Sequence, residues 1–110
     1  MSFQVSDTDG IVLVAVDGEL IVGNREAFKE VVIDQLDDGG RKFLIDFAES
    51  SYIDSSGLGA LVSLSKRIRE EGGELRLAGL NDDLRTLFEL TKLNTLFQIS
   101  DSRELALADF

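Results

Sequence analysis

The chain has 110 residues, and its 11 Lys and Arg residues against 21 Asp and Glu residues give a formal charge of −10. It contains no His and no Cys. These absences exclude Ser-His-Asp and Cys-His catalysis, ordinary zinc, haem and iron–sulfur sites, and disulfides. Carboxylate, hydroxyl and Lys/Arg chemistry remains, or binding alone. No catalytic pair or cofactor motif stands out, so we expect a protein that is not an enzyme and holds no cofactor.

The charge and the apolar pattern of the chain also limit which partners and which cellular location we expect. So acidic a surface repels phosphate backbones, and we expect no nucleic-acid partner. The longest apolar run, residues 11–16, is far shorter than the roughly 20 residues of a bilayer span, so we expect no membrane insertion. The first residues lack the basic and then apolar pattern of a signal peptide, which predicts a cytoplasmic protein. The length is typical of one domain.

The N-terminal segment predicts a β-hairpin followed by a helix. The dipeptide Asp9-Gly10 lies between residues 4–6 and 11–16 and is a strong two-residue hairpin signal. Residues 11–16 are apolar on both faces, so this strand should be covered on both sides, and residues 17–20 should end it. Asn24 is the expected N-cap of a helix with apolar residues at helical spacing, which residues 37–40 terminate.

The middle of the chain predicts two core strands flanking a loop and a long helix. Residues 42–47 form the first of these strands, and residues 48–57 read as a polar loop with two apolar anchors, Tyr52 and Ile53. A helix is expected from Gly57 to about residue 71, where two glycines end it. Residues 74–79 predict the next core strand.

The C-terminal third completes an alternating pattern. A helix capped by residues 81–83, a short edge strand at residues 96–99 and a helix opened by a capping box at residues 101–104 are expected. The order is therefore β-β-α-β-α-β-α-β-α. Strands alternating with helices predict a single α/β domain with a mixed, mainly parallel β-sheet and helices packed on it.

The sharpest candidate site lies between a core strand and the long helix, where open α/β sheets usually carry their ligands. Ser55 is expected to cap the helix, with its hydroxyl facing the backbone N–H groups of Gly57 and Leu58. Most serines at such positions do only that. The functional alternative is phosphorylation, which a helix N-terminus tolerates and which adds about −1.5 to −2 charges at one point. Inside a protein interface, next to the like charge of Asp54, that addition could break a complex.

Four segments resemble STAS domains of the anti-sigma factor antagonist type. They are residues 43–47 (FLIDF), 52–59 (YIDSSGLG), 72–77 (GGELRL) and 87–93 (LFELTKL). The resemblance extends over nearly the whole chain and implies one STAS domain spanning residues 1–110.

The resemblance implies partner switching. Such proteins bind an anti-sigma factor that is also a serine kinase of the histidine-kinase-like ATPase fold, and binding frees the sigma factor. The kinase phosphorylates the first Ser after the Asp, and a PP2C-type phosphatase reverses the step. Carried over to this sequence, the phosphoacceptor is Ser55. The expected partner-binding residues are Asp54, Ser56, Gly57, Leu58, Glu19 and Ile21.

One position departs from the family pattern. Many phosphorylated members carry an acidic residue directly after Gly-Glu-Leu at the end of the second strand, whereas this chain has Ile21 there. Glu19 and Asp46 are the carboxylates that could take its place. The alternative interpretation is therefore a STAS interaction module of another signalling or transport complex that is not phosphorylated.

Overall fold

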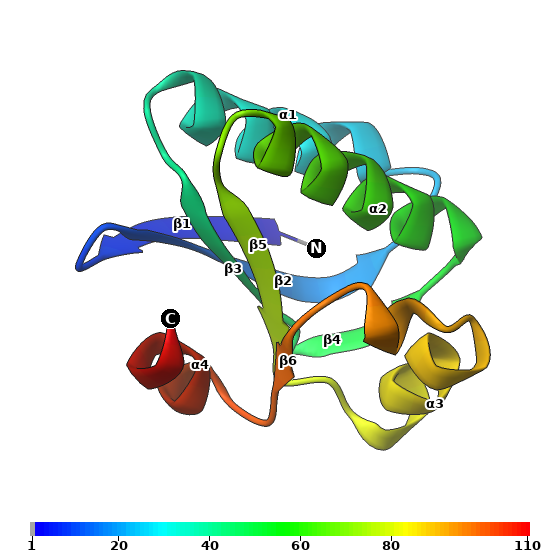
Figure 1. Cartoon of the computed structure of the whole chain (residues 1–110). Coiled ribbons are helices and arrows are strands. Elements are labelled where there is room, and N and C mark those ends of the chain that lie inside the picture. Colours follow the sequence, from blue (N-terminus) through cyan, green and yellow to red (C-terminus); the bar gives the residue numbers. More distant parts are fainter. Residues whose placement is uncertain (1) are drawn as a thin grey trace.

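The computed structural model of the chain describes residues 2–110 as one α/β fold (Figure 1). Six strands, four α-helices and one 3₁₀ turn appear in this part of the chain. In chain order they are β1 (Ser2–Thr8), β2 (Ile11–Leu20), α1 (Arg25–Asp37), β3 (Lys42–Asp46), β4 (Ser50–Ile53), α2 (Ser55–Glu70), β5 (Glu74–Ala78), α3 (Asp82–Leu90), the 3₁₀ turn η1 (Leu93–Thr95), β6 (Ile99–Ser100) and α4 (Arg103–Asp109).

The sheet is mixed and mainly parallel, which confirms the predicted fold class. Its strand order is β1-β2-β3-β5-β6, and β4 pairs with the last part of β2. Among the strands of residues 2–110, only β1 runs antiparallel to its neighbour. Asp9 and Gly10 join β1 to β2 with φ values of 53° and 82°, as a two-residue hairpin of the primed type requires.

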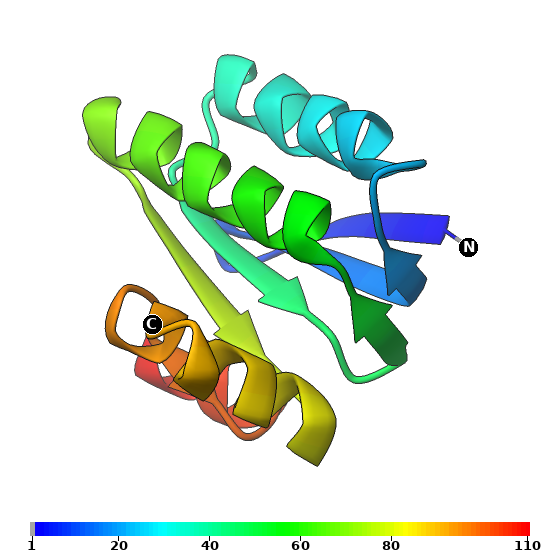
Figure 2. The same cartoon turned by 90° about the vertical axis from the view of Figure 1, so that its right-hand side faces the viewer.

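Helices cover both faces of this sheet, so β2 and β3 are buried on both sides. The helices α1 and α2 lie side by side on one face, and α4 lies on the other (Figures 1 and 2). The larger apolar cluster, between the sheet and α1 and α2, includes Phe28 and Phe43, and α3 adds Phe88. A smaller cluster around Leu44 and Ala106 fills the space beneath α4.

A half-buried ion pair also holds α4 on its face. Arg103 Nε, at the start of α4, lies 2.8 Å from Asp46 Oδ2 at the end of β3. Asp46 is only 4% exposed, and its other carboxylate oxygen accepts a hydrogen bond from the Ala48 N–H at 3.0 Å. The helix is found where the sequence predicts it, but its cap is one residue later than in the expected capping box at residues 101–104, because the Ser102 hydroxyl accepts from the Leu105 N–H.

The expected loop at residues 48–57 contains the extra strand β4. Residues 17–20 do not end the preceding strand either, because β2 pairs with β3 in its first half and continues past a register shift at Gly18 to pair with β4. The Ser50 hydroxyl, buried, donates to the Val16 carbonyl at 2.9 Å and ties the two strands together. Of the two expected anchors only Ile53 is buried, whereas Tyr52 is 52% exposed.

Two other elements have bounds that differ from those expected from the sequence. The helix α2 begins at Ser55, two residues before the expected start at Gly57. The edge strand β6 is Ile99–Ser100 and not residues 96–99, because the chain there first makes the η1 turn, in which the Phe97 N–H donates to the Leu93 carbonyl.

Candidate functional site

The carboxyl ends of β2 and β4 bring two distant segments together. Leu20 pairs with Ile53 across the parallel ladder, and the Asp54 N–H donates to the Leu20 carbonyl at 3.2 Å. Glu19 and Ile21 therefore lie beside residues 54–57, which we call the α2 turn. The structure thus places the expected partner-binding residues in one neighbourhood.

The N-cap of α2 is Asp54 and not Ser55, which corrects the expectation from the sequence. The Asp54 Oδ1 atom accepts from the Gly57 N–H at 2.8 Å, and the Leu58 N–H donates to the Asp54 carbonyl at 3.0 Å. The second carboxylate oxygen accepts from the Val22 N–H at 3.0 Å, 32 residues away in sequence. One carboxylate therefore starts α2 and also fixes the loop between β2 and α1.

Ser55 is the first residue of α2, and its side chain is exposed. Because Asp54 takes the capping role, the Ser55 hydroxyl makes no hydrogen bond to any residue between 2 and 110. It stands at the positive end of the helix dipole, where a negative group is stabilised. Ser56, the next hydroxyl, is partly buried. The geometry thus leaves Ser55 as the more accessible nucleophile of the pair.

Gly57 packs too closely against the end of β2 to carry a side chain. An added Cβ would collide with the Leu20 carbonyl oxygen and lie 2.9 Å from Ile53 Cγ2. Leu58, only 8% exposed, points into the core. These two expected partner-binding residues therefore shape the backbone of the surface and offer it little side-chain area.

Two exposed apolar side chains beside the α2 turn are absent from the sequence-based expectation. Val22 is 63% exposed, in the segment whose N–H is held by Asp54, and Tyr52 is 52% exposed on β4. In the sequence both stand as apolar residues among polar ones. Buried residues such as Ile53 show the same pattern, so the sequence does not reveal which of these side chains are exposed. Exposed apolar area of this kind is typical of protein interfaces.

The loop after β2 is held by an amide. Asn24 Oδ1 accepts from the Ile21 N–H at 2.7 Å, and Asn24 Nδ2 donates to the Glu19 carbonyl at 2.7 Å. Asn24 thus occupies the N-cap position of α1, as predicted, but its side chain closes the preceding turn and does not make the usual cap bond. The side chain of Ile21 is half-buried there, and that of Glu19 is exposed.

Of the two carboxylates that could replace the missing acid, Asp46 is excluded by its surroundings. It is buried and engaged with Arg103 and the Ala48 N–H. Glu19 is the one of the two that remains at the surface, opposite Tyr52 in the ladder between β2 and β4.

The backbone donors around Asp54 predict an acid-sensitive contribution to stability. The Gly57 N–H, the largest cause, and the Val22 N–H hold the pKa of Asp54 below its ordinary value of 3.8. The charged carboxylate therefore stabilises the fold fully above the ordinary pKa, and this stabilisation is lost as the pH falls through the lowered one. We expect the difference in unfolding free energy between the wild type and Asp54→Asn to be constant from pH 8 to about 5 and to shrink below about 4.

Urea denaturation followed by circular dichroism over that pH range measures this difference. Asp17→Asn is the matched control, because its carboxylate is exposed at the surface and makes no hydrogen bond or ion pair within residues 2–110. A gap between wild type and Asp54→Asn that persists unchanged at the lowest pH would contradict the assigned hydrogen bonds.

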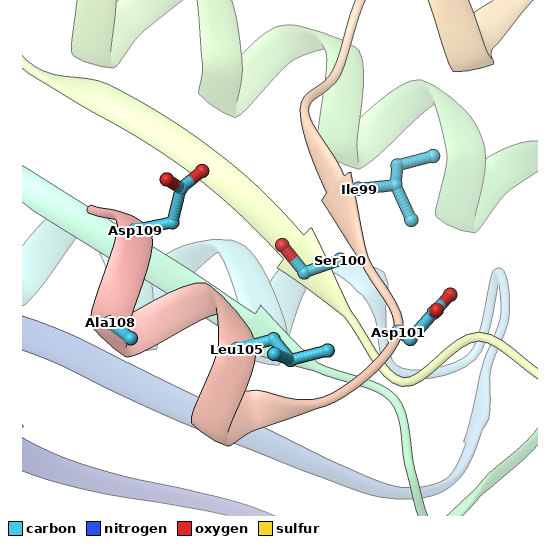
Figure 3. Close-up of a pocket in the computed structure, with 6 residues that line it drawn as sticks. All are labelled: Ile99, Ser100, Asp101, Leu105, Ala108 and Asp109. Carbon is cyan, nitrogen blue, oxygen red and sulfur yellow. The ribbon is translucent and has the colours of Figure 1, made fainter.

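We also searched the described residues for a pocket, a metal site and a membrane-spanning helix. A hollow of about 490 Å³ between β6 and α4 is lined by Ile99, Ser100, Asp101, Leu105, Ala108 and Asp109, none of which belongs to the α2 turn (Figure 3). Within residues 2–110, no three acidic side chains gather as a metal site would require. No helix in the same range is long and apolar enough to cross a bilayer.

Relatives and solved structures that are similar to this chain include anti-sigma factor antagonists. The anti-sigma-B factor antagonist of Staphylococcus aureus is 30% identical over 105 residues, which cover 96% of this chain and 97% of the relative. The crystal structure of TM1081 from Thermotoga maritima is 29% identical, with a TM-score of 0.91 over 97% of this chain and 92% of that chain. SpoIIAA of Bacillus, solved in its phosphorylated form, is 21% identical and shares the fold, with a TM-score of 0.77 over 98% of each chain. Since the STAS domain pattern also matches residues 2–106, the chain belongs to the STAS domain family.

Proposed function

We propose that this protein is an anti-sigma factor antagonist whose binding is switched off by phosphorylation of Ser55. It would act in the cytoplasm, with residues 1–110 as one STAS domain. The observation that carries the proposal is that two neighbouring residues of the α2 turn have different roles. Asp54 caps the helix, so the exposed Ser55 hydroxyl has no structural role that a phosphate would disturb.

The names of the relatives support the first half of the proposal. The S. aureus relative is named for antagonism of an anti-sigma factor, and it aligns with this chain over almost its full length. The partner we propose is accordingly an anti-sigma factor, and specifically one with a histidine-kinase-like ATPase fold that acts as a serine kinase. A PP2C-type phosphatase would hydrolyse the phosphoserine and restore binding.

The proposed docking surface is the α2 turn with the end of β2. Its members are Asp54, Ser56, Gly57, Leu58, Glu19 and Ile21, with the exposed Val22 and Tyr52 added from the structure. Apolar side chains at its edge and a carboxylate at its centre suit a partner that offers a basic group within an apolar rim.

In the phosphorylation step, Ser55 Oγ attacks the γ-phosphorus of ATP, ADP leaves, and the hydroxyl proton passes to a base of the kinase. The product places about −1.5 to −2 charges next to the Asp54 carboxylate. Because α2 begins there, the positive end of the helix dipole stabilises the phosphate within the fold. In the complex, by contrast, the phosphate and the Asp54 carboxylate are like charges that must be desolvated side by side against the single basic group of the partner, and the complex dissociates.

The experiment combines the purified protein, an ATPase-fold anti-sigma factor from the same genome and Mg-ATP, with intact mass as the readout. We expect one phosphate on the wild type and on Ser56→Ala, and none on Ser55→Ala. Ser55→Asp should bind the anti-sigma factor at least about tenfold more weakly than Ser55→Ala, about 1.4 kcal/mol. Phosphate on Ser55→Ala at the wild-type level would sink the site assignment, and equal binding of Ser55→Asp would sink the switch.

One observation favours a second candidate, a STAS interaction module in another signalling or transport complex. Ile21 stands where phosphorylated members commonly carry an acid, and Asp46 cannot replace it. This candidate predicts a partner that binds the same surface while Ser55 gains no phosphate from any ATPase-fold kinase of the genome. The Val22→Asp variant would then weaken that binding as well.

A further inference from the structure

The first strand of the sheet has a free edge. Within residues 2–110, β1 is the outermost strand and pairs only with β2 (Figure 2). In a hairpin with the two-residue turn Asp9-Gly10, the flanking pair Thr8–Ile11 exchanges both backbone hydrogen bonds. Bonded and non-bonded pairs then alternate along the ladder. The backbone N–H and C=O groups of Phe3, Val5 and Asp7 consequently point away from β2, off the edge of the sheet.

This edge lacks the usual protection against pairing. Proteins commonly guard such edges with Lys, Pro, a bulge or a covering segment. β1 spans seven residues with regular pairing, contains no Lys, Arg or Pro, and carries a single charged residue, Asp7. At its centre Val5 is 40% exposed, on the same sheet face as Phe3, whose ring lies 5.3 Å from that of Phe28 in α1. The opposite edge strand, β6, is only two residues long.

The edge is complementary to a second copy of itself. A two-fold axis through Val5 sets Val5 against Val5 of the second copy and Phe3 against Asp7 of the second copy. Each outward residue then meets an outward residue, so each pair exchanges both backbone hydrogen bonds. The charges also allow this register, because Asp7 faces an aromatic ring rather than another carboxylate.

We propose that β1 is a self-association edge through which two copies of this chain join their sheets, antiparallel and centred on Val5. We infer a second copy of this chain as the partner for the following reason. The register that gives every outward backbone group a hydrogen-bond partner also covers the half-exposed Val5 with Val5 of the second copy. The pairing uses no residue of the α2 turn, so it is independent of the proposed antagonist function. Because each copy carries a charge of −10, added salt should strengthen the association.

Because the chain has no Cys, a cysteine introduced by mutation is the only one available for a cross-linking test. In a hydrogen-bonded antiparallel pair the Cα atoms lie about 5.5 Å apart, with the side chains wider apart than at a non-bonded pair. A short bis-maleimide cross-linker, which spans this gap, should therefore join two copies of Val5→Cys covalently. Thr8→Cys is the matched control on the same strand, because its two copies would lie about 20 Å apart in this register. Equal cross-linking of the two variants would reject the register.

Association itself is measured by sedimentation of the unmodified chain from micromolar to millimolar concentration. We expect the wild type to dimerise, more strongly at high salt, and Val5→Lys to remain monomeric because two ammonium groups would meet at the axis. Circular dichroism must show Val5→Lys to be as folded as the wild type at low concentration. A wild type that stays monomeric at every concentration and salt, or a Val5→Lys variant that dimerises equally well, would overturn the proposal.

Discussion

Gly57→Ala should lower the unfolding free energy by about 2 to 3 kcal/mol. The reason is local: a Cβ at this position collides with the Leu20 carbonyl oxygen, which is backbone and cannot rotate away. Relief requires β2 and the start of α2 to separate, and that movement breaks the hydrogen bond from the Asp54 N–H to the same carbonyl. The variant should therefore lose partner binding as well as stability.

Gly59→Ala is the matched control, two residues further along the same helix. A Cβ there meets nothing within 4 Å, and the position is exposed. Ala in place of Gly in a helix usually gains about 0.5–1 kcal/mol, so this variant should be slightly more stable than the wild type. Because the chain has no Trp, urea unfolding is best followed by circular dichroism. Equal stability of the two variants would contradict the close packing at Gly57.

Arg103→Ala should destabilise the fold by about 2 to 3 kcal/mol, less than a fully buried pair because the arginine is itself partly exposed. The loss of stability arises from Asp46, the partner that remains in the fold. Asp46 is 4% exposed, and without Arg103 its carboxylate keeps only the Ala48 N–H as a donor. The α4 helix, which covers the second face of the sheet, should loosen first.

Two further variants separate this explanation from a simple loss of charge. Arg67→Ala removes an exposed arginine that pairs with Asp37 and Glu71 at 3.8 and 3.6 Å, and it should cost less than about 1 kcal/mol. Adding Asp46→Asn to Arg103→Ala removes the stranded charge and should recover part of the lost stability. No recovery in the double variant would argue against the buried carboxylate as the source of the cost.

Features that depend on neighbouring residues were predictable from the sequence. The Asp9-Gly10 hairpin adopts the positive φ values that the dipeptide predicts. Asn81 caps α3, with its side chain accepting from the Leu84 N–H at 2.8 Å. The mixed sheet follows from the opening hairpin together with the alternation of strands and helices, and the end of α1 at the paired glycines after Asp37 follows from their conformational freedom.

Features that depend on distant residues were not predictable. Asp54 and Ser55 are both good N-cap residues, so local rules cannot choose between them. The choice is made by the Val22 N–H, which the tertiary fold brings to the second oxygen of Asp54. β4 escaped prediction for a similar reason: it is four residues long, half exposed, and exists only because the end of β2 continues past Gly18 to pair with it. The site residues expected from the sequence do lie in one neighbourhood, but the capping residue and the exposed apolar pair were missed.

The unengaged hydroxyl of Ser55 has a consequence for protein turnover. Cellular proteases act mainly on unfolded molecules, so abundance follows the free energy of unfolding. Since Asp54 carries the cap and Ser55 contributes no hydrogen bond within residues 2–110, the phosphorylation that we propose for Ser55 should leave that free energy nearly unchanged. Both forms should then be degraded at the same rate. A cell could pass repeatedly between them by adding and removing one group, with the total amount of protein held constant and no new synthesis needed to reset the signal.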